Sequence, residues 1–297
     1  MKPPVAKVVP KQLEKHGIVR TDNYYWMRDR ENAEVIAYVK AENKYMEAMT
    51  AKSKDLREAL FKEFKRRIKQ TDMSVPFKLD GYYYYSRTEE GKDYPIYCRK
   101  KGTLDAAEQV LINVNRVAEG HKYCSVPPPA VTTSGRLMAY AVDTVGRRFY
   151  TLRFKNLSTG KELKDFIPNV TSNMTWAEDG RTLFYTRQHP TTLRSYQVYR
   201  HVLGTDASKD KLVFEEKDDT FTCGVFKTKS KKYIMVASHQ TVSAEYRYLE
   251  SAKPEAALRV FLPRQRDHEY SVDHFENEFY IRTNYKAKNF RLMKTPV

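Results

Sequence analysis

The chain has 297 residues, enough for one large domain or two ordinary ones with a substantial core. Its formal net charge is +16, but Lys and Arg occur in small clusters throughout, which favours a generally charged surface over a dedicated nucleic-acid face. The three cysteines are widely spaced and form no C-x-x-C pair, which excludes a zinc ribbon or a thioredoxin-type motif.

The N-terminus, MKPPVAKVVPKQ, contains no apolar stretch of the kind found in secretion signals. No run approaches the ~18 apolar residues that a membrane span needs. We therefore expect a cytoplasmic protein in a reducing compartment, without membrane contact.

Residues 16–29, HGIVRTDNYYWMRD, place Tyr24, Tyr25 and Trp26 between charged residues. Large aromatics are rare in disordered segments, so these three are expected to pack against a protein surface.

Residues 30–69 contain no Gly or Pro, and their apolar residues recur at spacings of three and four, which predicts an amphipathic helical stretch. Ser53 is a candidate N-cap that would divide the stretch into two helices. The basic residues at 62–69 fall where they complement the negative end of the helix dipole. We prefer this structural role for them over polyanion binding.

From about residue 75 the apolar period changes to two. GYYYYSR (81–87) leads through a hairpin signal to YPIYCRK (94–100). Similar strands begin at residues 137, 183, 233 and 279, at spacings of 46, 50 and 46, and each follows a turn and precedes a second strand. A period of this length with three or four strands per unit is typical of a β-propeller blade. Five units are present, the last with three strands at most.

The predicted fold is therefore mainly β, an incomplete propeller of about five blades (75–297) after an extended and helical segment (1–74). Two unclosed edges would remain, so an open arc that self-associates is expected.

Catalytic and cofactor motifs are absent from the sequence. None of the eleven glycines is followed at the second position by serine, so no G-x-S-x-G nucleophile elbow exists. Neither phosphate-binding glycine motif is present. The seven histidines show no metal-ligand spacing, and they are interpreted as surface loop residues, including His268 and His274 beside acidic neighbours. We expect no catalytic residue, no metal and no cofactor.

Several segments together resemble oligopeptidase B, of the prolyl oligopeptidase group of serine peptidases, with the trypanosomatid type most similar. The resemblance is collinear over nearly the whole chain. It lies in PPVAK (3–7), HGIVRTDNYYWMRD, VIAYVKAENKYMEAM (35–49), AEGHKYC (118–124), LMAYAVDTVGRRFYTLRFKNLSTGKEL (137–163), SYQVYRHVLGT (195–205) and KAKNFRLMK (286–294).

The resemblance implies a two-domain enzyme that cleaves short peptides after Lys or Arg. In the family an α/β-hydrolase domain holds the catalytic triad, and a seven-bladed propeller restricts access to it. No triad residue transfers to this chain, which is expected to lack the hydrolase domain and to be inactive alone. The matching N-terminal segment packs on that domain, which assigns domain packing to Tyr24, Tyr25 and Trp26. The turn with Arg147, Arg148 and Phe149 is expected at the face towards it, as interdomain or substrate-path residues.

Three hypotheses follow from these patterns. The first is the N-terminal, substrate-gating part of an oligopeptidase-B-like peptidase, whose partner is the hydrolase domain and whose substrates are short basic peptides. The second is a stand-alone propeller scaffold that binds a protein. The third, a basic nucleic-acid-binding protein, requires a localised positive face that the sequence does not display.

Overall fold

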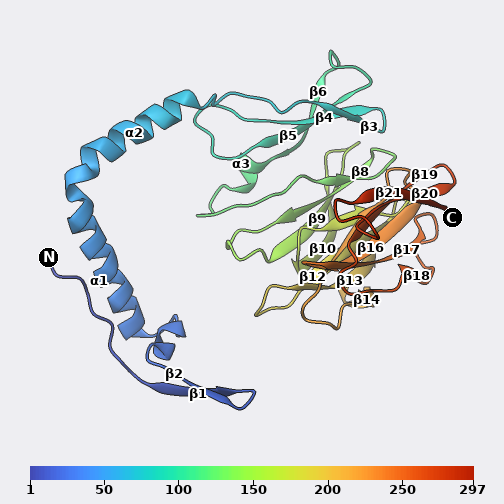
Figure 1. Cartoon of the computed structure of the whole chain (residues 1–297). Coiled ribbons are helices and arrows are strands. Elements are labelled where there is room, and N and C mark those ends of the chain that lie inside the picture. Colours follow the sequence, from blue (N-terminus) through green and yellow to red (C-terminus); the bar gives the residue numbers. More distant parts are fainter. The chain divides into compact units, whose positions relative to one another are not determined.

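The computed structural model describes all 297 residues, which divide into two compact units, Met1–Lys69 and Gln70–Val297 (Figure 1). Unit 1 contains a hairpin, two 3-10 turns and two α-helices: β1 (Lys11–Lys15), β2 (Ile18–Asp22), η1 (Tyr25–Arg28), α1 (Ala33–Thr50), η2 (Ala51–Ser53) and α2 (Lys54–Arg67). Unit 2 consists almost entirely of β-strands. It includes the residues just before 75, because the amide of Ser74 donates to the carbonyl of Ser86 in the first sheet.

The helical stretch of unit 1 begins at a polar cap. Asn32 accepts a hydrogen bond from the amide of Glu34, which satisfies one of the free N–H groups at the start of α1. The predicted division near Ser53 is confirmed, since η2 separates the two helices. The predicted capping by Ser53 is wrong. Its hydroxyl donates to the carbonyl of Thr50 in the preceding turn instead, so it makes no side-chain bond to α2.

Unit 2 is a propeller of five antiparallel sheets, each formed by strands in chain order. Blade 1 is β3 (Phe77–Leu79), β4 (Tyr82–Arg87), β5 (Ile96–Lys101) and β6 (Glu108–Asn113). Blade 2 is β7 (Ala130–Val131), β8 (Leu137–Val142), β9 (Tyr150–Asn156) and β10 (Glu162–Val170). Blade 3 is β11 (Met174–Trp176), β12 (Thr182–Gln188), β13 (Ser195–Val202) and β14 (Lys211–Glu215). Blade 4 is β15 (Thr222–Lys227), β16 (Tyr233–Gln240), β17 (Ser243–Glu250) and β18 (Arg259–Leu262). Blade 5 is β19 (Tyr270–Phe275), β20 (Glu278–Thr283) and β21 (Arg291–Pro296). Two short helical turns, α3 (Val114–Val117) and η3 (Ala207–Lys209), lie in the connections.

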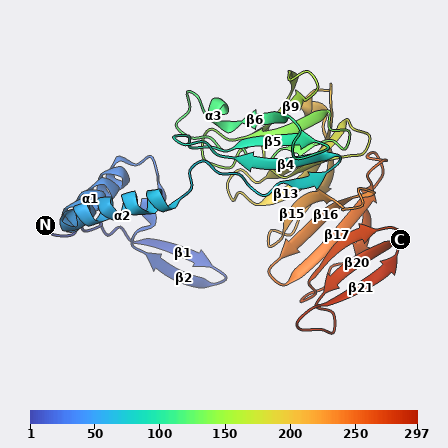
Figure 2. The same cartoon turned by 90° about the horizontal axis from the view of Figure 1, so that it is seen from above.

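The first strand of each blade lies towards the centre of the propeller. β11 contacts β7 on one side and β15 on the other, so the first strands of blades 2, 3 and 4 converge. Figure 2 shows blade 4 beside blade 5 in this arrangement. The predicted fold of about five blades is therefore confirmed, and so are the recurring strand pairs. The innermost strands were not assigned from the sequence. β3, β7 and β11 span only two or three residues, whereas β15 and β19, with six residues each, were also missed.

Apolar cores hold neighbouring blades together. Successive side chains of a strand point to opposite faces, so Tyr185 on β12 packs against blade 2 while Phe184 packs towards blade 4. Between blades 2 and 3, Trp176 meets Phe154 with ring centroids 5.9 Å apart, and its indole N–H donates to the carbonyl of Ala130. Each blade is thus joined to the next by large buried side chains.

The end blades bear ion pairs on the sheet face opposite to the side chains that pack on the neighbouring blade. On blade 1, Arg87 donates to both carboxylate oxygens of Glu108, above a small buried cluster that includes Cys98. On blade 5, Lys294 of β21 pairs with Glu278 of β20 at 2.9 Å. The terminal sheets therefore present charged as well as apolar side chains.

The interpretation of the histidines as surface loop residues is wrong for two of them. His201 on β13 and His274 on β19 are each only 1% exposed. The strand alternation that directs Tyr270 and Val272 of β19 towards blade 4 also directs His274 there, where its Nδ1 lies 2.8 Å from Ser230 Oγ. A buried polar residue within an alternating strand was the signal that could have found it.

Candidate functional site

The turn between β8 and β9 holds the predicted contact residues in a fixed shape. Asp143, at the end of β8, accepts hydrogen bonds from the amides of Val145, Gly146 and Arg148 at 2.7–2.9 Å. Gly146 and Arg148 adopt positive φ values of 86° and 59°, a conformation that Gly tolerates far better than Arg. The three bonds to one buried carboxylate offset the strain at Arg148 and fix the turn.

Arg147 and Arg148 project from this turn with exposed side chains, and neither forms an ion pair within the chain. Phe149 is half-buried beside them. The side-chain amide of Gln188 in blade 3 donates a hydrogen bond to the backbone carbonyl of Arg148 at 2.7 Å, which connects the turn to the next blade. The structure thus brings the three residues together on a rigid support and leaves two positive charges available to a partner.

Two of the three aromatic side chains in the Tyr24–Trp26 segment already have interaction partners within unit 1. The indole N–H of Trp26 donates to the carbonyl of Lys7 at 2.9 Å. The ring of Tyr25 lies between two cations, with Lys11 Nζ 3.8 Å and the Arg28 guanidinium 4.7 Å from its centroid. Tyr24 is 48% exposed. Of these three aromatic side chains, Tyr24 therefore keeps the most surface for further contacts.

Helix α2 carries a row of uncovered apolar side chains, here called the α2 apolar face. Its members are the exposed residues Leu56, Leu60, Phe61 and Phe64 of α2 and Ile68, which directly follows the helix. Phe61 and Phe64 are 67% and 61% exposed. No residue of α2 is buried. The helical periodicity predicted these positions, but it could not show that unit 1 leaves them open. An apolar row of this kind marks an interaction surface.

Polar side chains connect the inner turns of the blades. Glu178 in blade 3 accepts a hydrogen bond from Thr133 in blade 2 at 2.7 Å, and it forms an ion pair with Lys227 in blade 4. Lys231, in the turn after β15, forms an ion pair with Asp80, in the turn after β3. This last pair joins blade 4 to blade 1 across the inner side of the propeller. Charged groups of both signs therefore link the turns of blades 1, 3 and 4.

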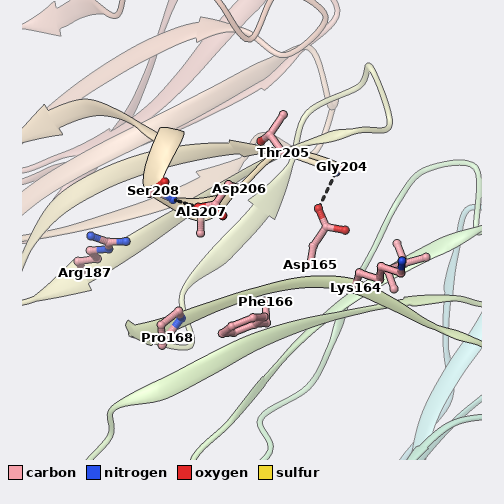
Figure 3. A pocket seen from close by; sticks show the side chains of 11 residues that line it. Lys164, Asp165, Phe166, Pro168, Arg187, Gly204, Thr205, Asp206, Ala207 and Ser208 are labelled. Carbon is pink, nitrogen blue, oxygen red and sulfur yellow. Dashed lines mark hydrogen bonds between the residues drawn. The ribbon is translucent and has the colours of Figure 1, made fainter.

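A cavity of about 690 Å³ opens between the last strand of blade 2 and the β13–β14 connection of blade 3 (Figure 3). Behind it, His201 lies between two carboxylates, with Nδ1 2.8 Å from Asp210 and Nε2 3.3 Å from Asp165. Burial alone would lower the pKa of His201, but the hydrogen bonds and charges of Asp210 and Asp165 raise it above its usual value. A protonated imidazole has two N–H donors, and an ionised carboxylate only accepts hydrogen bonds. The protonated form of His201 can therefore donate to both Asp210 and Asp165.

The chain has no helix with the length and apolar character of a membrane span. Its His, Cys, Asp and Glu side chains also form no group of three or more arranged to hold a metal ion.

The sequence matches the family described as "Prolyl oligopeptidase, N-terminal beta-propeller domain" over residues 3–297. The chain belongs to this family. That membership agrees with the five antiparallel blades and confirms the resemblance found in the sequence.

Two curated bacterial relatives match the chain along its whole length. It is 44% identical over 312 residues to "Dipeptidyl aminopeptidase BI" of Pseudoxanthomonas mexicana, with 99% of this chain and 43% of that protein covered. It is 37% identical over 306 residues to "Protease 2" of Moraxella lacunata, with 100% and 44% covered. The chain therefore spans less than half the length of the curated relatives that it matches.

Solved structures with the same arrangement include oligopeptidase B from Leishmania major, with a TM-score of 0.91 and 30% identity. Oligopeptidase B from Trypanosoma brucei, in a closed form with covalently bound antipain, gives a TM-score of 0.90 and 25% identity. In both comparisons the match covers 99% of this chain and 44% of the other. The propeller family is thus one whose members are joined, in these relatives, to a further large region.

Proposed function

We propose that this chain is the substrate-gating propeller part of a cytoplasmic serine peptidase that cleaves short peptides after Lys or Arg. The catalytic triad would be supplied by an α/β-hydrolase domain, since these 297 residues contain no nucleophile elbow. The observation that supports this proposal most directly is the match of 99% of the chain to oligopeptidase B of L. major at a TM-score of 0.91.

The α2 apolar face and the Tyr24–Trp26 segment are the proposed contacts of unit 1 with the hydrolase domain. Four apolar side chains of α2 and that of Ile68 are exposed, and burial of such a row releases about 25 cal/mol per Å² of apolar surface. We assign this row to a protein partner because solvent exposure alone gives it no stabilising role.

The β8–β9 turn is the proposed contact of unit 2. Arg147 and Arg148 are exposed, fixed in position and without an acidic partner, so they are suited to ion pairs with a facing surface. Phe149 is proposed to line the path of the peptide. In this arrangement the propeller selects substrates by size and the hydrolase domain cleaves them.

The proposal is tested by supplying the proposed partner. This chain is co-expressed with the remaining C-terminal region of the P. mexicana relative, and copurification is measured together with hydrolysis of Arg-Arg and Ala-Ala fluorogenic peptides. We expect a complex that cleaves the Arg-Arg substrate, and no hydrolysis by the chain alone. Failure to copurify would contradict the partnership, whereas a complex that cleaves only Ala-Ala would contradict the basic specificity.

Matched variants separate the two proposed contacts. Phe61→Ser with Phe64→Ser should weaken copurification. Arg147→Glu with Arg148→Glu should change the salt dependence of kcat/KM, because long-range attraction between charges is screened by salt. Arg181→Glu is the control, since Arg181 is exposed in a turn at the other end of its blade. If the unsubstituted complex, the Arg147→Glu/Arg148→Glu variant and the Arg181→Glu control all showed the same salt dependence of kcat/KM, the proposed role of Arg147 and Arg148 would be contradicted.

A stand-alone scaffold is the second candidate. The Arg87–Glu108 and Lys294–Glu278 pairs on the terminal blades favour it, because charged side chains on end repeats keep repeat proteins soluble. A monodisperse monomer with one cooperative unfolding transition would support this candidate.

A further inference from the structure

The cavity between blades 2 and 3 combines an apolar wall with a cation that has no acidic partner. Its lining comes from β10, from Arg187 on β12, and from the turn 204–208 (Figure 3). Phe166 of β10 is 59% exposed and forms part of the apolar wall together with Pro168 and Ala207. The volume of about 690 Å³ is in the range of small-molecule sites.

The two acidic side chains of the cavity are already used by the protein. Asp165 accepts from the amide of Gly204 at 2.5 Å and faces His201. Asp206 accepts from the amide of Ser208 at 2.8 Å, and the side chain of Ser208 together with this amide lowers the pKa of the Asp206 carboxyl. Both carboxylates therefore have partners of their own, and neither forms a salt bridge with Arg187.

Arg187 is held in place but is poorly satisfied. Its guanidinium lies 4.5 Å from the ring centroid of Tyr199, and its one side-chain hydrogen bond is a long one of 3.4 Å to the hydroxyl of Tyr185. It forms no salt bridge, and its buried Nε has no hydrogen-bond partner. A guanidinium has five N–H donors in a planar fork that fits a carboxylate. Stacking on Tyr199 fixes this fork before any ligand arrives, which lowers the entropy lost on binding.

We propose that this cavity binds a carboxylate attached to an apolar group, with Arg187 as the carboxylate anchor and Phe166 and Pro168 as the apolar wall. Lys164, which is exposed at the edge of the cavity, adds long-range attraction for the negative charge. This site does not depend on the proposed peptidase function.

The proposal is tested with a pair of probes that differ only in charge. N-acetylphenylalanine carries the carboxylate, and N-acetylphenylalanine amide is its neutral counterpart. Each is titrated into the ¹⁵N-labelled 297-residue chain, and the shifts of the Gly204 and Ser208 backbone amide signals are followed. We expect the carboxylate to shift these signals with a Kd on the order of 1 mM, and the amide to bind at least about tenfold more weakly.

Variants identify the anchor. Arg187→Gln should reduce the affinity for N-acetylphenylalanine about tenfold or more, while Arg181→Gln, an exposed arginine on the same blade, should leave it unchanged. Arg187→Lys keeps the charge but removes the fork, and is used if Arg187→Gln does not fold. It should then bind more weakly than the unsubstituted chain. Equal binding of the two probes, unchanged affinity in the Arg187 variants, or shifts confined to other parts of the chain would overturn the proposal.

Discussion

Lys231 of blade 4 forms an ion pair with Asp80 of blade 1, although two blades lie between them in the chain. Lys231 has a φ of 65°, and the corresponding turn positions of blades 2 and 3 are Gly135 and Gly180, each with a φ of 69°. A lysine here is strained by about 1 kcal/mol relative to glycine. The turn thus keeps a less favourable residue at the position from which its side chain reaches Asp80.

Lys231→Gly and Asp80→Asn should have different effects on stability. Lys231→Gly removes the ion pair but also the backbone strain, so the free energy of unfolding should stay within about 1 kcal/mol of the original value. Asp80→Asn removes the pair and keeps the strain, so it should lower that free energy by about 1 kcal/mol. Urea unfolding measures both. A larger loss in Lys231→Gly than in Asp80→Asn would contradict the strain argument.

The contact between Arg264 and Glu216 should be important for the junction of blades 3 and 4. The guanidinium lies 2.6 Å from the carboxylate of Glu216, which is 4% exposed, and 3.7 Å from the ring centroid of Phe221. Removing one partner of a buried pair leaves an uncompensated charge, so Arg264→Met should lower the free energy of unfolding by about 3 kcal/mol. Arg266→Met, at a fully solvated arginine nearby, should change it by less than about 0.5 kcal/mol.

The effect of Arg264→Met should depend on pH. Burial would raise the pKa of Glu216, but hydrogen bonds from Arg264 and from the amide of Asp218 lower it below its usual value. The stabilisation is therefore present above the unfolded-state pKa of about 4.3 and is lost as the pH falls through the lower folded-state pKa. Equal destabilisation at pH 7 and at pH 3 would show that the loss is one of packing.

His201 should make stability depend on pH in the opposite direction. Its folded-state pKa is raised by Asp210 and Asp165, so its contribution is fully present below the unfolded-state pKa of about 6.5. The contribution is lost as the pH rises through the folded-state pKa. His201→Gln should remove this part of the profile, and His239→Gln, at an exposed histidine, should keep it. Urea unfolding from pH 6 to pH 9 provides the comparison.

The α2 apolar face should cause the isolated chain to associate. Phe61→Ser with Phe64→Ser removes the two most exposed phenylalanines of α2, and should reduce the mean sedimentation coefficient and the binding of an apolar dye. Phe166→Ser, at another exposed phenylalanine, is the control for a general effect of apolar surface. An unchanged sedimentation coefficient in the double variant would contradict this prediction and would indicate strand pairing at the open edge of β21 as the cause of association.

Local patterns determine how much of this structure can be predicted from sequence. The two-residue period of 81–87 and its repeats predicted the blades, because the middle strands β4, β12 and β16 are six to eight residues long. The inner strands were missed. β3, β7 and β11 are too short to show a period, whereas β15 and β19 have six residues each and were missed although their length would have allowed it. Ser53 was a reasonable cap by type, yet its hydroxyl is nearer the carbonyl of Thr50.

The candidate sites were less predictable because they depend on contacts between distant segments. The turn with Arg147 and Arg148 was found from its sequence, but the role of Asp143 in holding it was not. The Asp165–His201–Asp210 group joins two blades and has no local signature. The buried state of His201 follows from its strand position, whereas its acidic neighbours require the fold.

The apolar cores of unit 2 lie between successive blades, and this has a consequence for local opening. An inner blade shares cores with two neighbours, while blade 5 shares one, with blade 4. In such arrays, segments at the end open with lower free energies than the interior. Amide hydrogens of β20 and β21 should therefore exchange with solvent deuterium before those of β12 and β16. Blade 1 also has a single neighbouring core, but Lys231 anchors it to blade 4, so its amides should be protected for longer than those of blade 5.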